Sequence, residues 1–237
     1  MDRKGCLIIG ASGGIGREVS MRISSREYRL FVHGKSETKL NALVKHLGSD
    51  SIKITKELMN RSDIYELINM IRVYEDQIDI AVIGFGPFLE ASLADMSHTQ
   101  YEYLFDMNVL LPSLLVTALA PRMAERNWGR IVLFGGTGTD RHGSYRRIAA
   151  YSAAKYALNS LVRSAGLEFG KQGVTVNLIC PGYVKTEYYS ETTLNILQNR
   201  GLLQEPETIA DIVEFLISDK SAAINGAVIN ADSALGH

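Results

Sequence analysis

The segment "IIGASGGIGRE", residues 8–18, is the strongest indication of the fold in this 237-residue chain. It directly follows a short apolar run and opens an amphipathic run that extends to about Glu27. Its glycines, Gly10, Gly14 and Gly16, are spaced G-x-x-x-G-x-G. Glycines in a strand-to-helix turn let the backbone approach a pyrophosphate, and the free N–H groups that begin the helix attract phosphates. The stretch therefore predicts a dinucleotide-binding turn; a glycine-rich turn without a ligand is the alternative.

The same pattern, a short apolar run followed by an amphipathic one, recurs along the chain. Apolar runs predict strands at 6–10, 29–34, 51–55, 79–84, 130–135, 174–180 and 227–230. Amphipathic runs predict helices at 14–27, 37–47, 63–74, 99–125, 149–169 and 207–217. Strands that are apolar on both faces and alternate with helices are typical of a parallel sheet covered on both sides. We predict a single α/β domain over residues 1–237, with a doubly wound, seven-stranded parallel sheet.

The bulk composition is that of an ordinary globular chain, with 46% apolar residues, 22% charged residues and a net charge of −1. The charge argues against nucleic-acid and membrane-surface partners. The amino-terminal "MDRKGCLIIGASGG" has too short an apolar run for a signal peptide, and the longest apolar stretch, 109–120, contains Pro112 and is too short to cross a bilayer. Cys6 and Cys180 lie in apolar runs, which indicates buried thiols in a reducing cytoplasm. We expect no metal centre.

Four further motifs follow the glycine loop in order: "FDMNVLLP" at 105–112, "YSAAK" at 151–155, "VNLICPGYVKTE" at 176–187 and "IADIVEFLISDKSAAINGAVINADS" at 209–233. Together they resemble the short-chain dehydrogenase/reductase family, in the single-domain branch of the 3-oxoacyl-(acyl-carrier-protein) reductases. Each motif is weak alone, but the joint match covers nearly the whole chain. The resemblance implies a Rossmann-like fold and an NAD(P)(H)-dependent oxidoreductase. Its substrate would be a ketone, a 3-oxoacyl compound or the corresponding secondary alcohol.

Tyr151 and Lys155 are four residues apart, which places them on one face of the predicted helix. A close ammonium favours the phenolate and would lower the pKa of a phenol from about 10. The resemblance implies that Tyr151 exchanges a proton with the substrate oxygen and that Lys155 also binds the nicotinamide ribose. It also implies that Asn108 helps to hold a water relay behind Lys155. The alternatives are two surface residues on an amphipathic helix and a buried asparagine that bonds local backbone.

The chain departs from the family pattern at the end of the fifth strand. The resemblance implies a serine there that hydrogen-bonds the substrate carbonyl, but Gly136 stands at that position. Losing a positioned donor to a developing oxyanion costs roughly a hundredfold to a thousandfold in rate. We predict that the adjacent Thr137 replaces the serine; Thr139 and Ser144 carry hydroxyls nearby.

Two other segments also depart from the pattern. The fourth strand ends in "IGFG" where relatives often have Asn-Asn-Ala-Gly, although Gly84 and Gly86 still let the backbone pass close to a cofactor ribose. The loop before Tyr151 is longer than is common in relatives and is basic at Arg141, His142, Arg146 and Arg147. Such a loop could hold a carboxylate, a phosphate or an acyl-carrier group, or could be a solvated loop or a subunit contact.

The end of the second strand predicts the cofactor. Gly34 stands where NAD-preferring relatives carry Asp, and Lys35 and Ser36, which follow it, suit a 2′-phosphate. We therefore predict NADP(H) in preference to NAD(H). By the resemblance, Glu57 contacts adenine and Thr186 reaches the nicotinamide carboxamide. The full set of predicted cofactor-binding residues is Gly10, Ser12, Gly14, Ile15, Gly16, Lys35, Ser36, Glu57, Leu58, Gly84, Gly86, Tyr151, Lys155, Pro181, Gly182, Val184 and Thr186.

Residues 187–206 correspond to the loop that forms the substrate lid in relatives, and we call them the lid segment. Tyr183, Tyr188 and Tyr189 could line an amphipathic pocket for an aromatic, alicyclic or acyl substrate.

The resemblance also implies a homotetramer or homodimer. Apolar runs at 109–120 and 156–167 fit such an interface, but they also fit ordinary burial. A nucleotide-binding protein with weak or lost catalysis, used in regulation or assembly, is the alternative function, and Gly136 is its main support. The epimerase or dehydratase branch of the superfamily would need a longer substrate domain.

Overall fold

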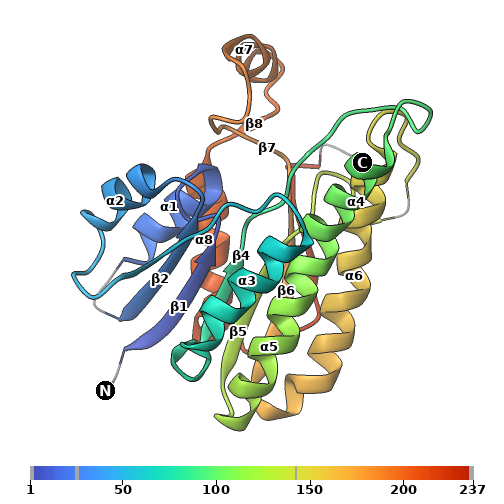
Figure 1. The fold of residues 1–237 in the computed structure, drawn as a ribbon. Helices are drawn as coiled ribbons and strands as arrows, with labels where there is room; N and C mark the ends of the chain where they lie inside the picture. Colours follow the sequence, from blue (N-terminus) through green and yellow to red (C-terminus); the bar gives the residue numbers. More distant parts are fainter. Residues whose placement is uncertain (1–2, 25–26, 142, 235–237) are drawn as a thin grey trace.

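The computed structural model describes residues 3–24, 27–141 and 143–234. Its central sheet has seven parallel strands in the order β3-β2-β1-β4-β5-β6-β9 (Figure 1). The strands are β1 (Lys4–Ile9), β2 (Tyr28–Gly34), β3 (Ile52–Thr55), β4 (Ile80–Ile83), β5 (Gly129–Phe134), β6 (Val174–Pro181) and β9 (Val228–Ala231). The predicted seven-stranded, doubly wound parallel sheet is confirmed.

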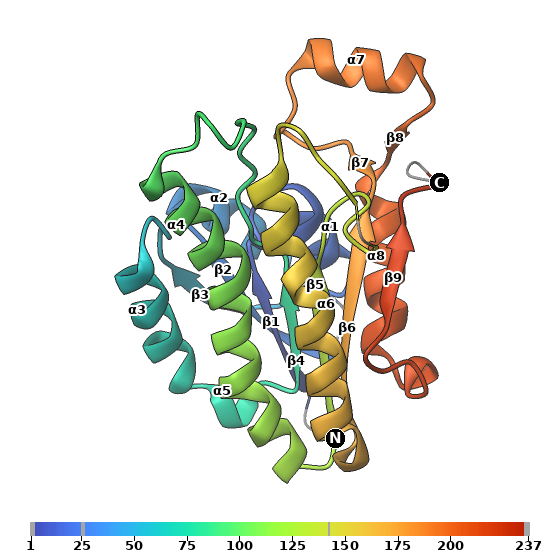
Figure 2. The ribbon, with the colours of Figure 1, turned by 90° about the vertical axis from the view of Figure 1, so that its right-hand side faces the viewer.

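Helices cover both faces of this sheet. The helices of the described chain are α1 (Gly14–Arg22), α2 (Glu37–Val44), α3 (Arg61–Arg72), α4 (His98–Phe105), α5 (Leu111–Glu125), α6 (Ala149–Phe169), α7 (Glu191–Asn199) and α8 (Pro206–Ile217), and all of them except α7 lie against the sheet. Short 3₁₀ turns lie at Glu75–Gln77, Gly170–Gln172 and Asp219–Ser221. Figure 2 shows α3, α4, α5 and α6 on the near face, with α1, α2 and α8 behind the sheet. The first helix ends at Arg22, so the predicted extension towards Glu27 is wrong.

Alternation along the strands builds a separate apolar core on each face. In β1, Leu7 and Ile9 pack with α3, α5 and α6, whereas Cys6 and Ile8 pack with α1, α2 and α8. Successive side chains of a strand point to opposite faces, so a strand buried on both sides must be apolar throughout. Cys6 and Cys180 are buried free thiols, as expected.

The long helix predicted at 99–125 is interrupted by a π-helical turn at Asp106–Leu110, between α4 and α5. Pro112 explains the interruption, because it has no N–H to give the carbonyl of Asn108 in an α-helix. By length and composition alone, the helical region His98–Glu125 could cross a membrane. However, 56% of its most apolar 18-residue stretch is buried within the protein. That burial is typical of a core helix.

The lid segment is more ordered than the predicted loop. It contains α7 and the two-residue strand β8 (Leu203–Gln204), which pairs with β7 (Tyr183–Val184). Ser190 accepts a hydrogen bond from the Thr193 N–H and caps α7. In both ribbon views α7 stands beyond the carboxyl ends of the strands, apart from the main body.

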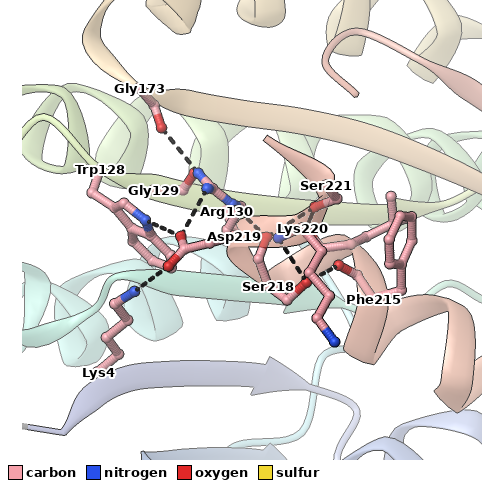
Figure 3. Close-up of polar contacts among 11 residues, drawn as sticks. Lys4, Trp128, Gly129, Arg130, Gly173, Phe215, Ser218, Asp219, Lys220 and Ser221 are labelled. Atoms are coloured by element: carbon pink, nitrogen blue, oxygen red, sulfur yellow. Dashed lines mark hydrogen bonds and ion pairs between the residues drawn. The ribbon is translucent and has the colours of Figure 1, made fainter. Parts of the chain in front are cut away.

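At the amino ends of the strands, opposite the lid segment, the buried Arg130 side chain holds the start of β5 (Figure 3). The Arg130 guanidinium donates to the carbonyls of Gly129, Gly173 and Ser218 and to the Asp219 carboxylate. Trp128 donates to the same carboxylate at 2.8 Å. This cluster joins β5 to the turns that precede β6 and follow α8.

Candidate active site

The glycine loop lies at the carboxyl end of β1 and turns directly into α1. Gly10 has φ +83°, which favours glycine. A Cβ on Gly16 would lie only 2.2 Å from the Gly10 carbonyl oxygen. A side chain at Gly16 would therefore push the first turn of α1 away from the loop. Ile15 is partly buried against the α1–α8 core.

The end of β2 lies next to this loop. A Cβ on Gly34 would lie 2.6 Å from Ser12 Oγ, so the glycine has a packing role as well as leaving the site without an acidic side chain. Lys35 Nζ lies 3.6 Å from Glu57 Oε1, and both side chains are exposed. Ser36 caps α2 by accepting from the Lys39 N–H. Leu58 is buried in the core.

The segment that follows β6 reaches the glycine loop from the other side of the cleft. Thr186 Cγ2 lies 3.0 Å from the position of a Cβ on Gly14. Val184 is buried, and the Gly182 N–H donates to the Ala231 carbonyl. The Pro181 carbonyl accepts a hydrogen bond from Thr137 Oγ1 at 3.1 Å. The structure thus brings the predicted 181–186 segment to the predicted phosphate loop.

Tyr151 occupies the space that a side chain at position 136 would need. A Cβ on Gly136 would lie 2.8 Å from Tyr151 Oη and 3.1 Å from its Cε1. The Phe88 ring meets the Tyr151 ring edge-on, with 4.9 Å between ring centres. Tyr188 from the lid segment packs edge-on against Phe88 and donates its hydroxyl to the Phe88 carbonyl at 3.2 Å. Glycine at 136 and burial under these rings set the position of the phenol.

Lys155 and Asn108 meet beside Gly86. A Cβ on Gly86 would lie 2.4 Å from Asn108 Oδ1 and 2.7 Å from Lys155 Nζ, so a side chain at this position would displace one or both of them. Lys155 Nζ donates to the Phe134 carbonyl at 2.9 Å, and Asn108 Nδ2 donates to the Pro87 carbonyl at 3.0 Å. Within the described residues, Asn108 Oδ1 is buried without a hydrogen-bond partner. Gly84 is exposed at the same edge.

Burial is the main cause of the pKa shifts of Tyr151 and Lys155. It raises the pKa of Tyr151 above its ordinary value of 10.0, with smaller contributions from Tyr189 and Tyr188. It lowers the pKa of Lys155 from 10.5 to about 8. The expectation that Lys155 lowers the pKa of Tyr151 is wrong for this arrangement. Lys155 Nζ lies 6.0 Å from the ring centre of Tyr151, and desolvation outweighs attraction at that separation.

The loop between β5 and α6 is buried and hydrogen-bonded near its start and exposed farther along. Thr139 is buried and bonds both the N–H and the carbonyl of Gly136, which makes it a structural residue. Arg147 pairs with Glu90 at 2.7 Å, whereas Ser144 and Arg146 are exposed. The loop also contains Arg141, which is exposed, and His142, which lies outside the described residues.

Sequence reasoning missed three contributors to the cleft. Phe88 follows the "IGFG" segment by two residues. An aromatic residue so close to the predicted cofactor turn could have indicated that it lines the cleft. Glu187 and Gly13 approach each other across 174 positions of sequence, and no local pattern indicates such a contact. Tyr183, Tyr188 and Tyr189 pack against one another. Ring centres are 5.5 Å apart for Tyr188–Tyr189 and 6.4 Å apart for Tyr183–Tyr189.

Comparison with known proteins agrees with this geometry. Residues 10–234 match the family model described as enoyl-(acyl carrier protein) reductase. The chain is 27% identical over 238 residues to 3-oxoacyl-(acyl-carrier-protein) reductase of Escherichia coli (strain K12), covering 97% of this chain and 96% of that protein. It is 24% identical over 254 residues to the (S)-acetoin-forming diacetyl reductase of Staphylococcus epidermidis (strain ATCC 12228 / FDA PCI 1200), covering 98% of each.

A solved structure of a short chain dehydrogenase/reductase family protein shares the fold, with a TM-score of 0.84 and 28% identity over 97% of this chain and 95% of that one. The family model spans nearly all of the sequence, and the glycine loop, Tyr151 and Lys155 all lie at the carboxyl end of the seven-stranded sheet. The protein belongs to the short-chain dehydrogenase/reductase family and is an NAD(P)-dependent oxidoreductase of carbonyl compounds.

Proposed function

We propose that this protein uses NADPH to reduce a ketone or 3-oxoacyl-type carbonyl to a secondary alcohol, with Tyr151 as the proton donor. The observation that carries this proposal is the position of the Tyr151 hydroxyl. It lies against Gly136, one helical turn from Lys155, at the edge where the glycine loop ends. The 3-oxoacyl class is supported by the Escherichia coli relative, whose name states that substrate.

The residues present fit a dinucleotide. Gly16 lets the first turn of α1 approach the glycine loop, and Asn108 Oδ1 is buried without a hydrogen-bond partner among the described residues. Gly10, Ser12, Gly14 and Ile15 would hold the pyrophosphate with the first turn of α1. Lys35 and Ser36 would take the 2′-phosphate, Glu57 and Leu58 the adenine, and Lys155 the nicotinamide ribose. The nicotinamide side of the cleft would be formed by Gly84, Gly86, Pro181, Gly182, Val184 and Thr186.

The bound nicotinamide supplies the hydride, and the chain supplies the proton. The Tyr151 phenol is protonated at neutral pH, the form that a reduction requires, and burial raises its pKa further above that range. The Tyr151 O–H bond breaks as the new O–H bond of the alcohol forms. The resulting phenolate would regain its proton from solvent by way of a water relay that Asn108 helps to hold behind Lys155. Lys155 itself changes protonation near pH 8, since burial lowers its pKa to about 8.

Thr137 remains our proposed replacement for the serine at position 136. Its hydroxyl donates to the Pro181 carbonyl at 3.1 Å, so it must turn to serve the substrate oxygen. The side chain is adjacent to Gly136 and only partly buried, which leaves room for that rotation. If Thr137 acts in this way, Thr137→Val should reduce turnover by about a hundredfold.

We further propose one domain over residues 1–237, with 187–206 as the substrate lid, acting in the cytoplasm as a homotetramer or homodimer. The two buried free thiols support a reducing compartment. The apolar runs at 109–120 and 156–167 fit an interface as well as the core packing that many of their residues show.

The test is NADPH oxidation against a panel of ketones and 3-oxoacyl thioesters, with native protein, Tyr151→Phe and Thr137→Val. We expect turnover by the native protein and a loss of at least about a hundredfold in Tyr151→Phe. Equal rates in native protein and Tyr151→Phe would refute the role of Tyr151. NADPH binding without turnover on any substrate would favour the alternative of a nucleotide-binding protein with lost catalysis. A parallel titration should give tighter binding of NADPH than of NADH.

A further inference from the structure

A carboxylate from the lid segment occupies the amino-terminal end of α1. The N–H of Gly14, the first residue of α1, donates to Glu187 Oε2 at 3.1 Å. Gly13 is the N-cap residue of this helix and has no side chain to cap it. A Cβ at Gly13 would lie 2.8 Å from Glu187 Oε1, so the glycine makes room for the carboxylate. Lys39 Nζ, from α2, lies 3.8 Å from the same oxygen.

This end of α1 is the position at which a dinucleotide pyrophosphate would bind under the proposed function, on which this inference rests. Both anions would use the same N–H groups and the same positive end of the helix, so they cannot be bound together. We propose that Glu187 is a built-in competitor of the cofactor pyrophosphate, and that NADPH must displace it.

The contact also couples the cofactor site to the proton donor. Glu187 is followed by Tyr188, whose hydroxyl donates to the Phe88 carbonyl at 3.2 Å. The Phe88 ring in turn covers Tyr151, with 4.9 Å between the ring centres. Glu187 and Tyr188 are neighbours in the chain, so the segment that contacts α1 also contacts Phe88. A single segment thus contacts both the pyrophosphate position and the ring that packs on the catalytic phenol.

The expected size of the effect is modest, because 58% of the Glu187 side chain remains exposed to solvent. Exposed charges at a helix end contribute about 0.3–1 kcal/mol, which corresponds to about a twofold to fivefold change in a dissociation constant. Competition by Glu187 lowers the fraction of molecules that can accept the pyrophosphate. The apparent dissociation constant for NADPH rises by the same factor.

The experiment titrates NADPH into native protein, Glu187→Gln, Glu187→Ala and a matched control, Glu191→Gln. Glu191 lines the same cavity as Glu187 at the base of the lid, and no contact between it and Gly13 or Gly14 is seen among the described residues. We expect both Glu187 variants to bind NADPH about twofold to fivefold more tightly than native protein. The control should match native protein. Unchanged or weaker binding in both Glu187 variants, or equal tightening in the control, would overturn the proposal.

Hydrogen exchange provides a readout that does not depend on activity. Before NADPH is added, amides of residues 187–199 should exchange faster in Glu187→Ala than in native protein, because the lid has lost its anchor on α1. Equal exchange in the two proteins would contradict the proposal that Glu187 anchors the lid segment on α1. The two proposals also fail differently. If native protein binds no NADPH at all, the proposed function fails. If it binds NADPH and the Glu187 variants bind NADPH as tightly as native protein does, only the proposed competition by Glu187 fails.

Discussion

Arg130 and Lys155 are both buried cations, and they lie at opposite ends of the parallel sheet. Arg130, at the amino end of β5, donates four hydrogen bonds, one of them to the Asp219 carboxylate (Figure 3). Lys155, near the carboxyl end of the same strand, donates to the Phe134 carbonyl. No carboxylate pairs with it in the described part of the chain.

The difference shows which end of the sheet is built for stability and which for chemistry. A buried cation with a carboxylate and several carbonyl partners is held in its charged form. A buried ammonium without an opposite charge has a lowered pKa and can change protonation near neutral pH, which is useful in catalysis. The carboxyl end also holds buried polar atoms for which the described residues offer no partner, such as Asn108 Oδ1 and His33 Nδ1.

The largest effect should come from Lys155→Met, which we expect to lower turnover by at least about a hundredfold while stabilising the fold by about 1–3 kcal/mol at pH 7. The folded pKa of about 8 lies below the ordinary 10.5. The unfolded chain therefore binds more protons between these values, and stability rises with pH across that window. The burial penalty is complete below pH 8, so the advantage of the variant should shrink towards pH 10. Urea unfolding at pH 7 and pH 9.5 tests this, and a less stable variant at pH 7 would contradict it.

Arg130→Met should have the opposite outcome. Removing the guanidinium leaves buried carbonyls without a donor, at a cost of about 2–4 kcal/mol in the free energy of unfolding. Turnover per folded molecule should not change, because Arg130 lies at the amino end of β5 and the candidate active site lies at the carboxyl end. The control is Lys220→Met, an exposed neighbour of the cluster, which should stay within about 0.5 kcal/mol of native protein. A specific loss of turnover in Arg130→Met would break the division between the two ends.

His33 predicts an acid-sensitive step at the carboxyl end. It is 2% exposed, and burial lowers its pKa from 6.5 to about 4. As the pH falls from 6.5 to 4, the unfolded chain takes up a proton that the folded chain does not, so stability falls by up to about 3 kcal/mol. His33→Gln should remove this part of the pH dependence while keeping a donor for the Lys56 carbonyl. Identical slopes of unfolding free energy against pH in both proteins would rule out His33 as the cause.

The smallest effects should separate two glycines of the β5 region. A Cβ on Gly129 meets Met123 Cβ at 2.5 Å, close to the backbone of α5, so Gly129→Ala should cost about 1–3 kcal/mol. A Cβ on Gly136 meets the far end of the Tyr151 side chain at 2.8 Å, which can shift. Gly136→Ala should therefore cost less than about 1 kcal/mol. Thermal unfolding of both variants decides, and a larger cost at Gly136 would mean that the phenol is held rigidly.

The sequence predicts the sheet well because its strands are buried on both faces. Runs such as "CLIIG" and "RLFVHG" must be apolar throughout, and they stand out without any knowledge of their neighbours. The helix α7 was not predicted, although Ser190 is an N-cap residue and Leu197 its buried anchor. A nine-residue helix with one buried side chain gives a weak periodic signal.

The candidate site was predicted where it depends on spacing and missed where it depends on burial. The four-residue interval between Tyr151 and Lys155 placed both at the cleft. It could not show that desolvation raises the pKa of the phenol. Likewise, the contact of Glu187 with Gly14 joins residues 173 positions apart and follows only from the path of the lid segment across the cleft.

The slight attachment of α7 to the main body has a practical consequence. Both flanks of the lid segment are anchored, by β7 and β8 on one another and by α8 in the core, while the helix between them buries only Leu197. Residues 188–202 should therefore be exchangeable as a cassette between related enzymes. Substrate choice could then be grafted onto this scaffold without rebuilding its interior.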